Sequence, residues 1–375
     1  MSDNPVLKMQ DYGQSMWLDF LRRGIIDSGE LQEMIDNDGV RGVTSNPSIF
    51  EKAIAGSGDY EDAIAELAAE GLEPGDIYER LAVEDIQRGT DLFRRMWDES
   101  DGQHGFVSLE VNPHLARDTS GTIEEARRLW ADVDRPNVLI KVPATKEGLP
   151  AIQQLIAEGI NVNVTLLFGL PRYAEVAEAY IAGIEERVSR GESVYRITSV
   201  ASFFLSRIDV LVDPMLKVKA QGDGREAEVA KKLYGQVAIA SAKTSYQMYK
   251  EIFGTLRWRR LADHGARVQR LLWASTSTKN PEFEDVKYVD ALIGPETVNT
   301  VPMDTLDAWR DHGEPRETLE EDLDQAAEVL DLLPELGIDI DQVTAQLVDE
   351  GIEKFNNPFD DLMDTLAEAV AEAQG

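Results

Sequence analysis

Short apolar, strand-like runs alternate with helical patterns along most of this chain, and this alternation limits the possible folds more than any other feature. Strands that alternate with helices are typical of parallel βαβ units. We predict eight strands, at Met16–Phe20, Gly42–Ser45, Phe106–Val111, Val138–Val142, Asn161–Phe168, Tyr195–Ser202, Arg270–Thr276 and Thr297–Val301. Eight such units indicate an α/β fold of the closed (β/α)8 type, a TIM barrel with additional helices. A doubly wound open sheet is the alternative.

The chain is longer than a minimal barrel needs. We expect a single barrel domain over residues 1–375, with a helical insert at about 213–269 and a C-terminal helical extension at about 304–375. The insert holds a turn at Gln221–Gly224, which one long helix follows. Proline and glycine should break the extension near Pro334–Gly337 and near Asn356–Pro358. No internal repeat or low-complexity linker indicates a second domain.

One predicted strand carries a charge in its middle, at Lys141. The ammonium form of a lysine is disfavoured in a water-poor core, and a buried amine can form a Schiff base with a carbonyl substrate. The alternative is a lysine at the strand's end, with its stem on apolar surface and its head in water. An isolated lysine does not distinguish the two.

Other polar side chains occupy strands that should be dry, because both faces of a parallel barrel strand are buried. Asn163 and Thr165 share one face of strand five, and Ser202 lies on one face of strand six. Each of these residues alone could belong to a polar layer whose members satisfy one another.

Carboxylates occur in two further strands, at Asp19 and Glu110. A buried carboxylate needs a cation or hydrogen-bond donors nearby, and active sites in such barrels lie at the C-terminal ends of the strands. A closed barrel would bring both carboxylates to Lys141. At the end of the second strand, Pro47 favours an extended backbone at Asn46, which could point its amide across the barrel mouth. Locally, Asn-Pro is also an ordinary turn.

Two basic residues are candidates for phosphate recognition at the same end. Arg207 follows strand six and Lys279 follows strand seven, and the loops there are a common phosphate position in barrels. A competing cluster around Trp258 consists of Arg257, Arg259, Arg260, Arg267 and Arg270. We interpret it as a solvated helix face that makes salt bridges.

Composition excludes several classes of function. The net charge of −33 argues against binding to nucleic acids or to anionic membranes, and an anionic substrate would need basic residues gathered at its site. This acidity is a solubility device or an adaptation to salt. The chain has no cysteine, and its four histidines, which are His104, His114, His264 and His312, show no metal-ligand spacing and suggest surface roles. We expect a cytoplasmic protein without signal peptide, membrane span, metal or cofactor.

With these residues in hand, the chain resembles the transaldolases, in particular the longer bacterial branch. The resemblance runs from Trp17-Leu-Asp19 to the helix after strand eight. It rests on ordered motifs, which are Val43-Thr-Ser-Asn-Pro-Ser-Ile-Phe50, Ser108-Leu-Glu-Val111, Leu139-Ile-Lys-Val-Pro-Ala-Thr145, Gly159-Ile-Asn-Val-Asn-Val-Thr-Leu-Leu167 and Ser202-Phe-Phe-Leu-Ser-Arg207.

This resemblance implies a barrel enzyme of the pentose phosphate pathway that needs no cofactor. Its reaction moves a dihydroxyacetone unit from sedoheptulose 7-phosphate to glyceraldehyde 3-phosphate, giving erythrose 4-phosphate and fructose 6-phosphate. The implied roles are Schiff-base formation at Lys141, proton removal from the C4 hydroxyl by Asp19, and proton shuttling by Glu110 with Thr165. The implied substrate-binding residues are Asn46, Asn163, Ser202 and Arg207.

One position departs from the shorter transaldolases, which carry a second phosphate-binding arginine after strand seven. This chain has Ser275-Thr-Ser-Thr-Lys279 there, and we assign the role to Lys279. Two other functions stay open at this point. One is a Schiff-base aldolase that releases free dihydroxyacetone, and the other is an inactive barrel that binds sugar phosphates as a sensor.

Overall fold

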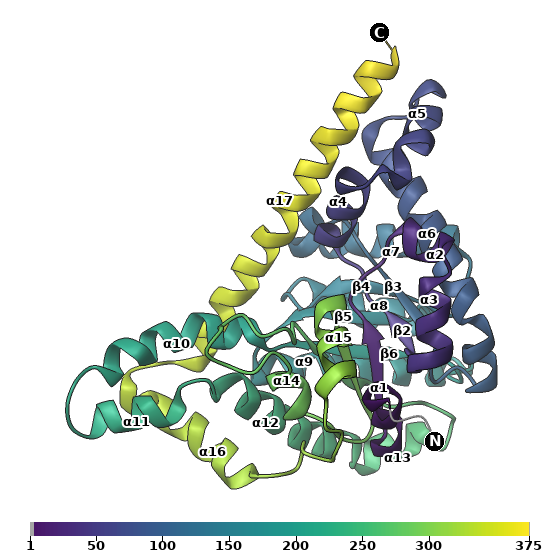
Figure 1. Cartoon of the computed structure of the whole chain (residues 1–375). Coiled ribbons are helices and arrows are strands. Elements are labelled where there is room, and N and C mark those ends of the chain that lie inside the picture. Colours follow the sequence, from purple (N-terminus) through teal and green to yellow (C-terminus); the bar gives the residue numbers. More distant parts are fainter. Residues whose placement is uncertain (1–3, 375) are drawn as a thin grey trace.

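Eight parallel strands form a closed barrel in the computed structural model of this chain, which describes residues 4–374 (Figure 1). The strands are β1 (Gln14–Leu18), β2 (Gly42–Val43), β3 (Phe106–Glu110), β4 (Val138–Pro143), β5 (Val162–Leu167), β6 (Ser199–Phe204), β7 (Arg270–Ala274) and β8 (Thr297–Val301). The last strand pairs with the first over five residues. This closure confirms the predicted (β/α)8 barrel and excludes the open sheet.

The strand boundaries differ most from the prediction at β6, which begins at Ser199 and not at Tyr195. Arg196 has a φ of +68°, in the left-handed region that a strand cannot accommodate. Strand β2 is shorter than predicted and ends at Val43, so Thr44 and Ser45 lie just beyond it at the mouth of the barrel.

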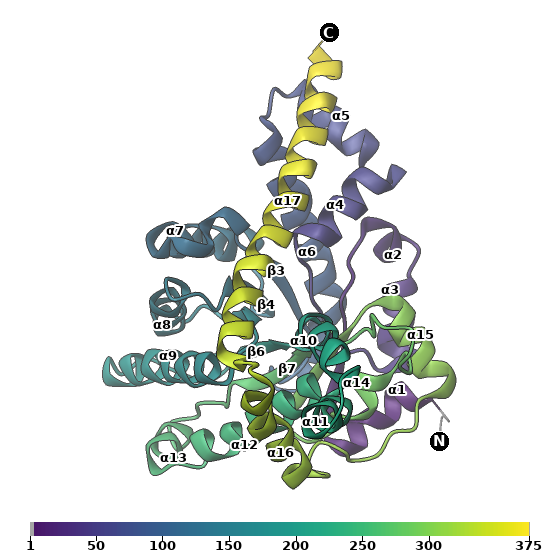
Figure 2. The ribbon, with the colours of Figure 1, turned by 90° about the vertical axis from the view of Figure 1, so that its left-hand side faces the viewer.

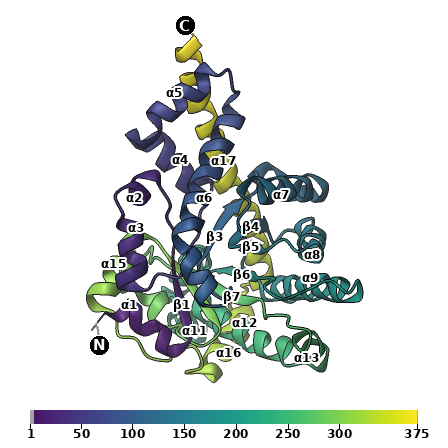
Figure 3. The same cartoon turned by 90° about the vertical axis from the view of Figure 1, so that its right-hand side faces the viewer.

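Helices surround the barrel (Figures 1 and 3). The α-helices are α1 (Pro5–Lys8), α2 (Arg23–Asp27), α3 (Glu30–Glu33), α4 (Pro47–Gly56), α5 (Glu61–Ala69), α6 (Pro74–Glu99), α7 (Thr119–Val133), α8 (Gly148–Glu158), α9 (Leu170–Ser189), α10 (Ser206–Ala220), α11 (Arg225–Leu233), α12 (Val237–Phe253), α13 (Leu256–Ala262), α14 (Lys287–Asp290), α15 (Met303–His312), α16 (Leu323–Leu332) and α17 (Ile340–Gln374). Short non-α turns are η1 (Met9–Tyr12), η2 (Met34–Asp38), η3 (Gly58–Tyr60), η4 (Pro113–Arg117) and η5 (Leu333–Leu336).

The prediction of one long helix in the insert is wrong, because the segment folds as α11, α12 and α13. Gly235, with a φ of +69°, separates the first two, and its N–H donates to Asp213 Oδ1 at 2.8 Å. The side chain of Thr255 accepts from the N–H of Trp258 and starts α13. Glycine freedom and a side-chain cap therefore decide where these helices end and begin.

Only one of the two breaks that were predicted at proline in the extension is present. Helix α16 ends at η5, as predicted for Pro334–Gly337, but α17 continues through Pro358. A proline inside a helix costs about 3 kcal/mol. Buried Phe355, Phe359 and Leu362 lie on both sides of Pro358 in the sequence, and the packing of this apolar face offsets that cost. The insert and extension also pack on each other, α12 against α16 and α10 against α17 (Figure 1).

At the N-terminal ends of the strands, two residues that were predicted to lie on the surface, His104 and Arg270, are partly buried. His104 is half-buried, with Nε2 2.9 Å from Arg41 Nη1, and burial lowers the pKa of His104 to about 3. Arg270 begins β7, where burial lowers its pKa to about 10 and its guanidinium donates to the Gln103 carbonyl. A surface role is therefore wrong for His104, and Arg270 is not part of the solvated face.

Of the remaining basic cluster, the three arginines on α13, which are Arg257, Arg259 and Arg260, are exposed as expected, whereas Arg267 lies after the helix and is half-buried. Arg257 forms ion pairs with Glu178 at 2.6 Å and with Glu185 at 2.7 Å, both on α9. Arg267 pairs with Asp101 at 3.2 Å. These partners neutralise part of the positive charge of the cluster. Within residues 4–374, no helix has both the length and the hydropathy that crossing a bilayer requires.

Candidate active site

Lys141 lies within β4, at a level where neighbouring strands carry polar side chains. The barrel register pairs it with Glu110 of β3 on one side and with Asn163 of β5 on the other. Only 4% of Lys141 is exposed, so its head does not reach bulk water. Its Nζ atom donates to the backbone carbonyl of Ser45 at 2.8 Å and lies 3.1 Å from Glu110 Oε2. The amine is thus held between a carbonyl and a carboxylate.

The carboxyl group of Glu110 is buried beside the Lys141 ammonium. Burial raises the pKa of Glu110, and the nearby charge of Lys141 opposes this shift. Its Oε2 pairs with the Lys141 ammonium, whereas Oε1 and the buried Oγ1 of Thr165 have no hydrogen-bond partner within the described residues. Buried polar atoms without partners are rare, so the Thr165 hydroxyl is free for a molecule bound beside Lys141.

A second carboxylate, Asp19, follows β1 and faces the same space. Its Oδ1 accepts from Thr44 Oγ1 at 2.6 Å, and Thr44 Oγ1 lies 2.7 Å from Thr300 Oγ1. Burial raises the pKa of Asp19, while the charge of Lys141 and the hydrogen bond from Thr44 act in the opposite direction. Two carboxyl groups with raised pKa values therefore flank one lysine, an arrangement suited to proton transfer.

A cavity of about 230 Å³ opens above Lys141 at the C-terminal ends of the strands. Most of the residues that the sequence selected line it, namely Asp19, Asn46, Lys141, Thr165, Ser202, Arg207 and Lys279. The barrel brings these side chains together from six strands or the segments that follow them. The convergence expected from the strand pattern is therefore present in the structure.

Glu110 and Asn163 lie beneath the cavity and not in its lining. Asn163 Nδ2 donates to Ser108 Oγ at 3.0 Å, and its Oδ1 accepts from Ser202 Oγ at 2.7 Å. Both ends of this amide are therefore engaged by the neighbouring strands. Asn163 orients Ser202, which does line the cavity.

Asn46 has both of the roles that its sequence allowed, a local one in the turn before a helix and a place at the mouth of the barrel. Its backbone is extended, with a φ of −159°, and its Oδ1 accepts from the N–H of Ile49 at 3.0 Å. It is thus the N-cap of α4, which Pro47 begins. The side chain also lines the cavity, which leaves its Nδ2 group for a ligand.

Two cations stand at one side of the cavity. Arg207 lies in the first turn of α10, where burial lowers its pKa and its Nη1 finds no acceptor among residues 4–374. Lys279 Nζ donates to Ser277 Oγ at 2.6 Å. Burial lowers the pKa of Lys279, and the charge of Arg207 adds to this effect. Among residues 4–374 neither cation forms an ion pair with a carboxylate, so the pair can attract an anion despite the net negative charge of the chain.

Comparison with known proteins agrees with this geometry. Residues 16–366 match the family model described as transaldolase/fructose-6-phosphate aldolase. The chain belongs to this family. It is 48% identical to the transaldolase of Trichodesmium erythraeum, over 99% of this chain and 98% of the relative. It is 47% identical to transaldolase 2 of Nostoc punctiforme, over 99% and 98%, and 44% identical to the transaldolase of Saccharopolyspora erythraea, over 98% of each.

These findings confirm the expected family and function class, a transaldolase that acts as a transferase. The site of this transaldolase also contains residues that the sequence analysis did not select, namely Thr44, Phe204, Thr300 and Phe355. Thr44 stands in the same motif as Asn46 and could have been chosen for its position after the strand. Phe355 belongs to α17, and nothing in the local pattern of an amphipathic helix distinguishes it from a core residue.

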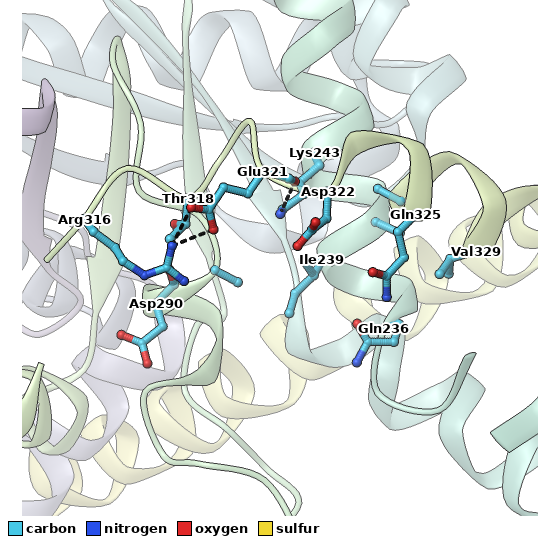
Figure 4. A pocket seen from close by; sticks show the side chains of 13 residues that line it. Gln236, Ile239, Lys243, Asp290, Arg316, Thr318, Glu321, Asp322, Gln325 and Val329 are labelled. Carbon is cyan, nitrogen blue, oxygen red and sulfur yellow. Dashed lines mark hydrogen bonds and ion pairs between the residues drawn. The ribbon is translucent and has the colours of Figure 1, made fainter. Parts of the chain in front are cut away.

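A second buried lysine, Lys243 of α12, lies outside the barrel beside a cleft of about 270 Å³ (Figure 4). It is 7% exposed, and burial lowers its pKa. Its Nζ donates to the backbone carbonyl of Glu321 at 2.6 Å. The Glu321 carboxylate pairs instead with Arg316, at 2.6 Å. Lys243 is thus buried like Lys141, but no ion pair joins it to a carboxylate within residues 4–374. It serves as an internal control for the assignment of the nucleophile.

Proposed function

We propose that this transaldolase uses Lys141 as its Schiff-base nucleophile toward phosphorylated sugars and works in the cytoplasm as a single barrel domain. The observation that carries the proposal is the position of Nζ, which lies 3.1 Å from Glu110 and 2.8 Å from the Ser45 carbonyl at the base of the cavity. An amine at this place can reach a ketone in the cavity and pass its proton to a carboxylate.

Formation of the imine needs three proton transfers, and Glu110 is placed to take part in them. Glu110 takes a proton from the Lys141 ammonium, and the neutral amine adds to the donor's C2 carbonyl. A proton then passes from the nitrogen of this adduct to its C2 oxygen, which gives a carbinolamine. A proton returned through Glu110 and Thr165 then lets the C2 hydroxyl leave as water, which gives the iminium. The raised pKa of Glu110 suits a group that must both accept and donate.

Cleavage of the C3–C4 bond is assigned to Asp19. It takes the proton of the C4 hydroxyl, the C3–C4 electrons move to the iminium nitrogen, and the aldehyde product leaves an enamine on Lys141. Thr44 holds the carboxylate of Asp19 by a 2.6 Å hydrogen bond. Addition of the enamine to the acceptor aldehyde reverses these steps.

The remaining residues bind the sugar chain. The Nδ2 group of Asn46 and the hydroxyl of Ser202 are proposed to bind substrate hydroxyls, with Asn163 orienting Ser202. The guanidinium of Arg207 is proposed to bind the phosphate through charge-assisted hydrogen bonds, with Lys279 as the second cation. Together the two cations at the cavity supply the local positive charge that a phosphate needs in a chain with a net charge of −33.

Borohydride trapping tests the nucleophile. The protein is incubated with fructose 6-phosphate and reductant, digested, and examined by mass spectrometry. We expect a dihydroxyacetone-sized adduct on Lys141. Lys141→Ala and the more closely sized Lys141→Met should fold but show neither adduct nor activity, and Lys243→Ala should retain both. An adduct on Lys243, or activity in a folded Lys141 variant, would overturn the assignment.

A further inference from the structure

Helix α17 crosses the mouth of the barrel (Figures 1 and 2). In Figure 2 it runs in front of the labelled strands, and in Figure 3 it lies behind them. One of its residues, Phe355, lines the catalytic cavity and is only 4% exposed. The extension thus supplies part of the active site.

The ring of Phe355 lies near both reactive ends of the cavity. Its centroid is 5.9 Å from Lys141 Nζ and 5.9 Å from Arg207 Cζ. These distances place the aromatic face at the limit of cation–π contact with each cation. The ring therefore covers the path between the nucleophile and the cation proposed to bind phosphate, and we call Phe355 the roof of the cavity.

The surroundings of α17 hold this roof close to the strands. Gly351 lies one turn before Phe355, and a Cβ there would stand 2.9 Å from Leu166 Cδ2. Leu166 itself has a φ of +53°, at the place where the β5–β6 register shifts. One turn after the roof, Phe359 packs edge-on against Tyr78, with ring centroids 5.4 Å apart. The helix is therefore seated on both sides of Phe355.

The chemistry of the enamine explains why an apolar roof matters. The enamine left on Lys141 can add to an acceptor aldehyde, which is transfer. Alternatively, a proton from solvent adds at its C3 carbon to give an iminium. Water then adds at C2, and departure of the amine releases dihydroxyacetone. The second route needs water at the enamine, and closing a site against water suppresses such hydrolysis.

We propose that Phe355 is a specificity-determining residue that favours transfer over release by excluding water from the enamine. This inference rests on the proposed role of Lys141. It assigns to the C-terminal extension a function in the reaction, in addition to its packing against α4, α5 and α6.

The test measures the ratio of free dihydroxyacetone to sedoheptulose 7-phosphate formed from fructose 6-phosphate and erythrose 4-phosphate. Phe355→Ala should raise this ratio by about tenfold or more, equivalent to about 1.4 kcal/mol in relative barrier height. Phe355→Leu keeps the site apolar and nearly as large, and should raise it less. Phe359→Ala is the matched control, because it removes a buried ring from the same helix outside the cavity, and it should leave the ratio unchanged.

The outcomes separate this inference from the proposed function. If folded Phe355→Leu and Phe355→Ala keep the wild-type ratio while the adduct is trapped on Lys141, the roof proposal is wrong and the nucleophile stands. An equal rise in Phe359→Ala would mean that general loosening of α17 causes the effect, and would also overturn it. Absence of the Lys141 adduct in the wild-type protein would instead contradict the proposed function.

Discussion

Lys141 Nζ and Glu110 Oε2 lie 3.1 Å apart, and the side chains are only 5% and 3% exposed. The attraction within a buried ion pair rarely exceeds the cost of removing both charges from water, so such pairs add little stability. The position of this pair at the base of the cavity therefore indicates a role in the reaction.

Glu110→Gln should slow imine formation. Glutamine keeps the shape of the side chain but cannot take the ammonium proton, so we expect kcat to fall by about a hundredfold to ten-thousandfold. The rate at which borohydride traps any sugar on Lys141 should fall in parallel. Trapping at the wild-type rate would show that Glu110 does not carry this proton.

Asp19→Asn should block the reaction at a later step. The asparagine Oδ1 can still accept from Thr44, so the site keeps its shape, but no base remains for the C4 hydroxyl. We expect kcat to fall by about a hundredfold or more. The adduct on Lys141 should then have the mass of the whole hexose phosphate. A dihydroxyacetone-sized adduct formed at normal speed would remove Asp19 from the cleavage step.

Loss of Arg207 should weaken the binding of phosphorylated substrates. A hydrogen bond to a charged group is worth about 1.5–3 kcal/mol, so Arg207→Ala should raise KM for glyceraldehyde 3-phosphate about 10- to 100-fold. Lys279→Ala should have a smaller effect, because its side chain is exposed and its charge is more strongly screened by water. Unphosphorylated glyceraldehyde is the control. If its KM rises by the same factor in these variants, neither cation binds the phosphate.

His104 should make the fold sensitive to acid. Its folded pKa of about 3 lies below the ordinary 6.5, so in this window the unfolded chain binds a proton that the folded chain does not. Stability is therefore lost as the pH falls from 6.5 toward 3, by about 2 kcal/mol at pH 5. We expect urea denaturation of His104→Gln to show a drop between pH 7.5 and pH 5 that is smaller by this amount.

The exposed His264 provides the comparison for this experiment. His264→Gln should show the same drop in unfolding free energy as the wild-type protein. If His104→Gln also shows the wild-type drop, carboxyl groups and not His104 account for the acid sensitivity.

Much of the site was visible in the sequence because its signals are local. A charge within an apolar strand selects Lys141, and the alternation along strand five places Asn163 and Thr165 on one face. What those atoms contact was not visible. Both ends of the Asn163 amide bond to Ser108 and Ser202, whose separations in the chain are 55 and 39 residues.

Proline and glycine were less dependable as signals of where helices end. Pro358 predicted a break that buried neighbours on α17 override, whereas Gly235 creates a break that the helical pattern concealed. His104 carries no local sign of burial, since Arg41 and Ser15 approach it from other strands or their flanking segments.

The sequence by itself determined the order of strands and helices, the faces of the strands and the chemical groups available for reaction, because each depends on neighbours a few residues apart. Only the tertiary structure decided that Phe355 lies over Lys141. That contact depends on how closely α17 can approach the barrel, which Gly351 and the left-handed Leu166 permit together. No local pattern encodes such an approach, because it results from packing between segments that are distant in the chain.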